Sequence, residues 1–193
     1  MINKTPSPIL TATCEIEAVS KIAGQTVSVF TCDQQLYRVT INIMWDDPVR
    51  WKNFYPRIDG MHWVMSFVGC ICKLMQNSGL DLLMKAAFAG VDSMLVGKKF
   101  PMNTRALRIV VVELLRMLID KTTTQDDLNE TLQVLQKDSQ LAEHWITNLI
   151  YPVFLIMLYV RAEREGEFSL HLYACYKMVP HFFAASHLEL CKR

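Results

Sequence analysis

Two short apolar segments in the first third of the chain are predicted to be β-strands, and a segment with helical spacing lies between them. The first strand covers residues 26–32 and is rich in β-branched residues, and the second covers residues 54–58. Between them, Leu36, Val39 and Ile43 recur at intervals of three and four residues, which predicts an amphipathic helix. The order strand, helix, strand predicts a parallel βαβ unit over residues 26–60.

From His62 onward, apolar positions follow helical periodicity almost to the end of the chain. The apolar face of the first of these helices is expected to carry Met61, Met65, Val68, Cys72 and Met75. The pattern predicts helices over residues 62–75, 80–88, 105–120, 125–137, 139–164 and 170–190. Pro152 and Pro180 are expected to interrupt the last two, because proline removes a backbone hydrogen bond within a helix.

These elements predict a helix-rich α/β fold, in which the small βαβ unit packs against five to seven helices. Residues 1–13 are expected to be a loose leader, with a short helix over residues 15–23. Residues 14–193 are expected to form a single α-rich domain, divided into the βαβ unit (26–60) and a helical part (61–193). Because a two-stranded sheet is marginal alone, the helices must supply most of the core.

Composition indicates an ordered protein without a strong overall electrostatic field. Hydrophobic residues make up 51% of the chain and charged residues 20%, which excludes a disordered chain. The net charge of +1 cannot hold nucleic acid or an anionic membrane globally, so any such contact needs a local patch.

The cysteines and the N-terminal residues predict an intracellular protein of the cytoplasm or nucleus. The six cysteines follow no disulfide-scaffold spacing, and the first residues lack the apolar core of a signal peptide. The longest apolar run, 149–160, would be about 18 Å long as a helix, against a hydrocarbon core of about 30 Å. We therefore expect a buried core helix there and no membrane contact.

Polar groups follow both predicted strands. Asp33 comes directly after the first strand, and Asp59 and His62 come after the second. Neighbouring parallel strands bring such residues to one edge of a sheet, where open α/β folds carry their sites. Asp33, Asp59 and His62 are therefore candidate catalytic residues, and Asp33 and His62 could bind Mg²⁺ or Mn²⁺ for phosphodiester cleavage. The alternative is that Asp33 only caps the helix that follows it and that His62 lies in the first turn of the next helix, in which case no cofactor is needed.

Two further groups of residues could bind a ligand. Lys98, Lys99, Arg105 and Arg108 form a modest basic stretch that could contact nucleic acid, or could simply be a solvated turn. Cys175, His181, His187 and Cys191 have a spacing that suggests zinc, but His181 and His187 are too far apart to share one helix face. Apolar helix faces rich in methionine and leucine could instead bind a protein partner.

Several segments resemble the motifs of one family. Phe30–Tyr37 resembles an F-D-x-x-L-Y motif, and Arg57–Phe67 resembles G-G-F-H-x-x-M, with Asp59 in place of a glycine. Near the end, Arg161–Leu172 resembles R-A-x-R-x-G-x-W-x-L-H-L, with Phe168 for tryptophan, and Met178–His187 resembles M-x-P-x-F-x-A-x-x-H. The family consists of uncharacterised invertebrate proteins that look like pieces of transposable elements.

The resemblance implies a mobile-element fragment, truncated at both ends relative to the family and without catalytic activity. Two alternatives remain open. One is a metal-dependent nuclease or integrase-like remnant, since an acid at one strand end and a polar group at the next are similar to a degraded RNase H-like core. The other is a helical protein-interaction module.

Overall fold

The computed structural model describes residues 8–88, 100–120, 122 and 124–186. The chain divides into two compact units, Met1–Trp63 and Val64–Arg193, and each is described by itself. The boundary between them falls within the residues of helix α3 (Gly60–Leu74). The described residues form a helix-rich α/β fold with one small parallel sheet, as the sequence pattern predicts.

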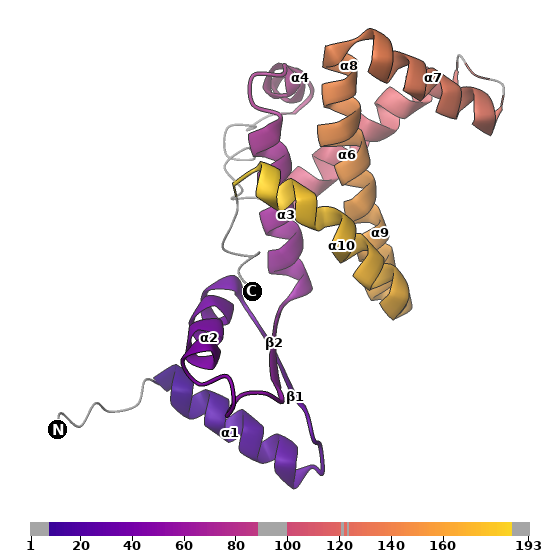
Figure 1. Cartoon of the computed structure of the whole chain (residues 1–193). Helices are drawn as coiled ribbons and strands as arrows, with labels where there is room; N and C mark the ends of the chain where they lie inside the picture. Colours follow the sequence, from indigo (N-terminus) through magenta and orange to yellow (C-terminus); the bar gives the residue numbers. More distant parts are fainter. Residues whose placement is uncertain (1–7, 89–99, 121, 123, 187–193) are drawn as a thin grey trace. The chain divides into compact units, whose positions relative to one another are not determined.

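The first unit is built around the predicted βαβ arrangement. Its elements before α3 are α1 (Pro8–Ile22), β1 (Ser28–Cys32), α2 (Gln34–Asp46) and β2 (Phe54–Ile58). The two strands pair in parallel, with Ser28 opposite Phe54 and Cys32 opposite Ile58 (Figure 1). Because the two strands start and end at paired residues, the residues that follow Cys32 and Ile58 leave the sheet side by side.

The core of the first unit is small and aromatic. Trp51 and Phe54 are each only 2% exposed, and their rings meet edge to face with centroids 5.5 Å apart. The guanidinium of Arg50 lies over Trp51 and donates to the Cys14 sulfur of α1 at 3.1 Å. These contacts tie α1 to the segment between α2 and β2.

Helix α1 begins earlier than expected, at Pro8. Residues 8–13 are therefore helical, and only residues 1–7 of the predicted leader lie outside the described chain. Proline suits the first turn of a helix, because its fixed φ matches the helix and its missing N–H has no partner there. The Thr13 side chain, 1% exposed, donates to the carbonyl of Ile9 and is satisfied within the helix.

The second unit contains most of α3 and the remaining helices. These are α4 (Leu80–Ala87), α6 (Phe100–Ile119), α7 (Gln125–Asp138), α8 (Gln140–Trp145), the π-helical turn η1 (Ile146–Ile150), α9 (Tyr151–Glu165) and α10 (Phe168–Ala184). Phe67 of α3 packs edge to face on Phe182 of α10, and neither side chain is exposed. Figure 1 shows α3, α9 and α10 grouped in this unit.

The buried face of α3 agrees with the expected one only in part. Val68 and the following Met75 are each 2% exposed, as expected, whereas Met61 is 55% exposed. Val64, Phe67 and Ile71, which lie off the expected face, are 3% exposed or less. Nearly every position of α3 is apolar, so the periodicity alone does not select a face.

Residues 140–165 form one continuous helical stretch. The π-turn η1 joins α8 to α9 just before Pro152, so the proline falls in the first turn of α9 rather than inside it. By length and composition, Gln140–Glu165 is the stretch within the described residues that could cross a membrane, and 44% of its apolar window is buried inside the protein.

Helices α9 and α10 form an antiparallel hairpin that positions part of the sites described below. Gly166 ends α9 with φ +69°, a left-handed conformation that glycine adopts without strain. Helix α10 continues through Pro180 to Ala184, so the expected interruption does not occur there. The tight turn at Gly166 brings the last turns of α9 against the first turns of α10 (Figure 1).

Candidate functional site

Asp33 ends β1 and caps the N-terminus of α2. Its side chain accepts a hydrogen bond from the Leu36 backbone N–H at 2.8 Å, and its own backbone is extended. This is the geometry of an N-cap, which satisfies one of the free amide groups at a helix start. One Asp33 oxygen is therefore engaged in capping.

Asp59 makes the equivalent contact after β2 and holds His62 as well. Its Oδ1 accepts from the His62 backbone N–H at 2.9 Å, and its Oδ2 lies 2.6 Å from His62 Nδ1. Burial raises the pKa of the Asp59 carboxyl, but these bonds and the charge of His62 together hold it below its usual value. Asp59 and His62 thus form the capping pair of α3.

The two acids flank one buried thiol. The Asp59 backbone N–H donates to the carbonyl of Cys32 at 2.9 Å, and Cys32 is 7% exposed. Burial, with smaller contributions from the charges of Asp33 and Asp59, raises the pKa of Cys32 to about 11. Both carboxylates therefore lie near the same sulfur, as the predicted strand ends imply.

This arrangement is not a complete metal site by itself. Within the described ranges, no group of three or more His, Cys, Asp and Glu side chains is placed to hold a metal ion. Mg²⁺ requires near-octahedral oxygen ligands, and the capping bonds already use one oxygen of each acid. Asp33 and His62 would need added water or a substrate phosphate to complete such a site.

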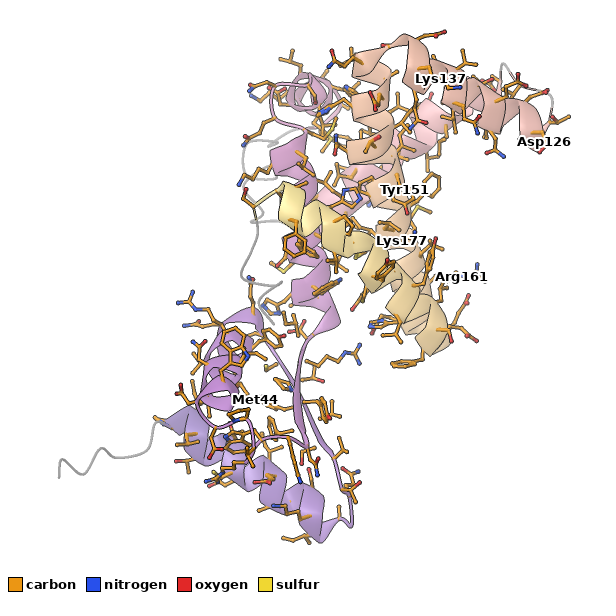
Figure 2. The ribbon with its side chains drawn as sticks, viewed as in Figure 1. Met44, Asp126, Lys137, Tyr151, Arg161 and Lys177 are labelled. Atoms are coloured by element: carbon orange, nitrogen blue, oxygen red, sulfur yellow. The ribbon has the colours of Figure 1, made fainter. Side chains whose placement is uncertain are left out.

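Four arginines meet at a groove between α6 and α9, in the second unit. The groove has a volume of about 550 Å³ and is lined by Arg105 and Arg108 from α6 and by Arg161 and Arg164 from α9. Its apolar lining comes from α9, chiefly Val153, Ile156, Met157 and Val160. Figure 2 labels Arg161 on α9. Of the predicted basic stretch, the structure thus places Arg105 and Arg108 in one cavity, whereas Lys98 and Lys99 lie outside the described residues.

The charges of this groove are only partly balanced. Arg161 donates to both oxygens of Glu165 at 3.0 Å. Arg105, Arg108 and Arg164 are exposed and make no ion pair with any residue in the described part of the chain. Three guanidinium groups therefore stand beside an apolar surface with their charge available to a ligand.

A third cluster was missed by sequence reasoning. The imidazole of His171 lies between two side chains: its Nδ1 is 2.7 Å from an oxygen of Glu163, and its Nε2 is 3.6 Å from the sulfur of Cys175. The spacing of four residues between His171 and Cys175 was visible in the sequence. The contribution of Glu163 depends on the α9–α10 turn and was not.

Cys175 and His181, the two described residues of the zinc-like spacing, contact different partners. His181 is 9% exposed and packs edge to face on Phe67, and burial lowers its pKa. Cys175 contacts His171 instead, and His187 and Cys191 lie outside the described residues.

Comparison with known proteins identifies a family but no characterised relative. No curated protein and no solved structure matches the chain. One family model matches residues 1–139 and 122–193, which together span the whole chain. The chain therefore belongs to the family described as "Domain of unknown function (DUF8702)".

Proposed function

We propose that this chain is a non-catalytic binding module whose α6–α9 groove takes an acidic amphipathic helix from a protein partner. The observation that carries the proposal is the set of unpaired arginines, Arg105, Arg108 and Arg164, beside an apolar groove wall. Arginine binds carboxylates with two parallel hydrogen bonds, which makes glutamate and aspartate its natural partners.

The apolar wall favours a helix over a bare anion. Val153 and Ile156 are each 2% exposed and form the base, while Met157 is 38% exposed. A helix that binds in a groove inserts apolar side chains spaced three and four residues apart and leaves its charged flanks at the rim. The arginines on both walls are placed to meet such flanks.

The two helices that form the groove also carry exposed apolar side chains outside its lining, which favours an extended partner. Met102 on α6 and Phe154 on α9 are 47% and 38% exposed, so apolar surface is available on both helices that form the groove. Nucleic acid, which Arg105 and Arg108 suggested, would meet the arginines through phosphate but would gain little from valine, isoleucine and methionine. An acidic peptide uses both features.

The same proposal includes the origin and location of the protein. The motif resemblance supports descent from a transposable element, with the ancestral activity lost. No disulfide joins the five cysteines within the described part of the chain, which suits a cytoplasmic or nuclear protein. Capping by Asp33 and Asp59 supports a structural use of residues that could otherwise be catalytic.

The proposal is tested by titrating the full chain into a fluorescently labelled helical peptide that carries leucine on one face and glutamates along its edges. Loss of a charged hydrogen bond costs about 1.5–3 kcal/mol, so Arg105→Ala and Arg164→Ala are each expected to weaken binding by about tenfold or more. Arg116→Ala is the matched control, because Arg116 lies on α6 outside the groove lining and is already paired with Glu113 and Asp120. Equal losses in all three variants, or tighter binding of a DNA oligonucleotide than of the peptide, would contradict the proposal.

A metal-dependent nuclease remains the second candidate, because the last residues of the two strands are paired and Asp33 and Asp59 therefore leave the sheet side by side. It predicts DNA cleavage in Mn²⁺ that is lost in Asp33→Asn, and heat on titration with Mg²⁺. The binding module predicts neither cleavage nor heat.

A further inference from the structure

We propose that Cys175 is a nucleophilic thiol, activated by His171 and Glu163, that forms a reversible mixed disulfide with small disulfides such as oxidised glutathione. This inference does not depend on the α6–α9 groove. It rests on three side chains of the α9–α10 hairpin that the binding proposal does not use.

The hydrogen-bond order across the imidazole orients it as a base. A glutamate oxygen can only accept, so the Glu163 contact at 2.7 Å places the proton of neutral His171 on Nδ1. The other nitrogen, Nε2, then presents its lone pair to Cys175 Sγ at 3.6 Å. Nucleophile, base and orienting carboxylate lie in the order that activates a thiol.

Packing holds this arrangement in place. The ring of Tyr159, 3% exposed, lies 4.8 Å from the His171 ring between centroids. The His171 side chain is 13% exposed and the Glu163 side chain 40% exposed. Cys175 is of intermediate exposure and is therefore not sealed in the core.

Two other cysteines of the chain have surroundings that oppose ionisation, and a third is fully buried. Cys32 and Cys72 both have their pKa raised to about 11 by burial, and Cys70 is 1% exposed. Cys72 is a useful comparison, because it is also of intermediate exposure but its sulfur contacts no histidine among the described residues. The structure therefore distinguishes Cys175 chemically from these three thiols.

The reaction is a thiol–disulfide exchange. His171 Nε2 takes the proton of Cys175, and the thiolate attacks one sulfur of the small disulfide. A new bond forms between Cys175 and that sulfur, the original S–S bond breaks, and the other half leaves as a thiolate that the imidazolium can protonate. Attack by a second small thiol reverses the step.

The groups that set the pH dependence of this thiol come from both helices of the hairpin. His171 on α10 contacts the sulfur, and Glu163 on α9 holds His171. On α10, Lys177 lies over the rings of Tyr173 and Tyr176. Because His171 is the group that contacts the Cys175 sulfur, substitution of His171 tests this contact directly.

The experiment measures iodoacetamide alkylation of each cysteine in the full chain by peptide mass spectrometry, between pH 5.5 and about 10. The alkylation rate of Cys175 is expected to have its midpoint at least about one pH unit below 8.5, the ordinary value for cysteine. His171→Gln is expected to return that midpoint to about 8.5. Glu163→Gln keeps a hydrogen-bond acceptor without charge and is expected to give an intermediate midpoint.

Incubation of the same proteins with oxidised glutathione at pH 7 gives the second readout. Cys175 is expected to carry the glutathione adduct, Cys72 is not, and reduction is expected to remove it. Circular dichroism checks that His171→Gln remains folded, and Glu163→Gln provides an independent variant. An unchanged midpoint in both variants, or Cys72 modified as fast as Cys175, would overturn the proposal.

Discussion

Replacing Asp33 and Asp59 by alanine and by asparagine separates helix capping from metal binding. Each acid accepts a backbone N–H bond, from Leu36 and His62 respectively, at 2.8 and 2.9 Å. Alanine removes this acceptor, and loss of an N-cap costs about 1 kcal/mol. Asparagine keeps a side-chain oxygen in the same place and is a comparable cap, so its expected cost is a few tenths of that.

Asp59 has one further partner, so its two variants should differ slightly from those of Asp33. Its bond to His62 Nδ1 joins side chains that are about one-third exposed, and such pairs contribute between about 0 and 1 kcal/mol. Asp59→Ala is therefore expected to lower the unfolding free energy by about 1–2 kcal/mol. Asp59→Asn should cost less than half of that.

A metal site makes the opposite prediction in the same assay. A ligand present at one hundred times its Kd stabilises the folded state by about 2.7 kcal/mol. Urea unfolding followed by circular dichroism, with and without Mg²⁺, measures both effects. Capping predicts the order alanine worse than asparagine and no effect of Mg²⁺. Stabilisation by Mg²⁺ that disappears in Asp33→Asn, or asparagine as damaging as alanine, would refute the capping argument.

Three further perturbations test the second unit by urea unfolding. Burial lowers the pKa of His181 in the folded protein. The stability that neutral His181 contributes is therefore present above about pH 6.5 and is lost as the pH falls through the lower folded-state pKa. The His181→Phe variant should show a flatter decline in stability at low pH, and an equal decline in both proteins would contradict this prediction. Gly166→Ala should cost about 1–2 kcal/mol, because alanine is strained at φ +69°, although its Cβ would meet no atom within 4 Å; no loss would argue against the left-handed cap. Trp145→Phe removes the bond from Nε1 to the Ser78 carbonyl, 3.3 Å long, and should cost about 1 kcal/mol; an unchanged midpoint would show that this bond is not made in solution.

The βαβ unit was predictable because its local signals agree with one another. Residues 28–32 and 54–58 are short, β-branched or aromatic runs, and Asp33 is both a strand end and a good N-cap. The sequence pattern therefore located the strands, the intervening helix and the two acids. It could not decide whether the acids cap helices or bind metal, since both uses place an aspartate at the same position.

Helix faces and the clusters of the second unit were less accessible to sequence reasoning. In α3, apolar residues surround the helix, so the buried side of Phe67 and Ile71 depends on what packs against it. Arg108 and Arg164 are far apart in sequence and meet only because α6 lies beside α9. Periodicity gives the face of one helix at a time and carries no information on such pairings.

The two prolines of the second unit's long helices gave signals that local context modified. Pro152 was expected to break a helix and instead starts α9 after a π-turn, whereas Pro180 lies within α10. Buried packing of Met178 and Phe182, each with no exposed surface, holds α10 together across the missing hydrogen bond. Tertiary contacts outweigh the local penalty at that position.

A charge-swap titration shows whether the arginines of the α6–α9 groove pair with the carboxylates of an acidic helix. The double variant Arg105→Glu, Arg164→Glu is titrated into the acidic peptide and into a matched peptide with lysine in place of glutamate. The variant is expected to lose binding to the acidic peptide and to bind the lysine peptide, whereas the native chain is expected to show the reverse preference. Loss of the acidic peptide without gain of the lysine peptide would contradict direct pairing in the groove.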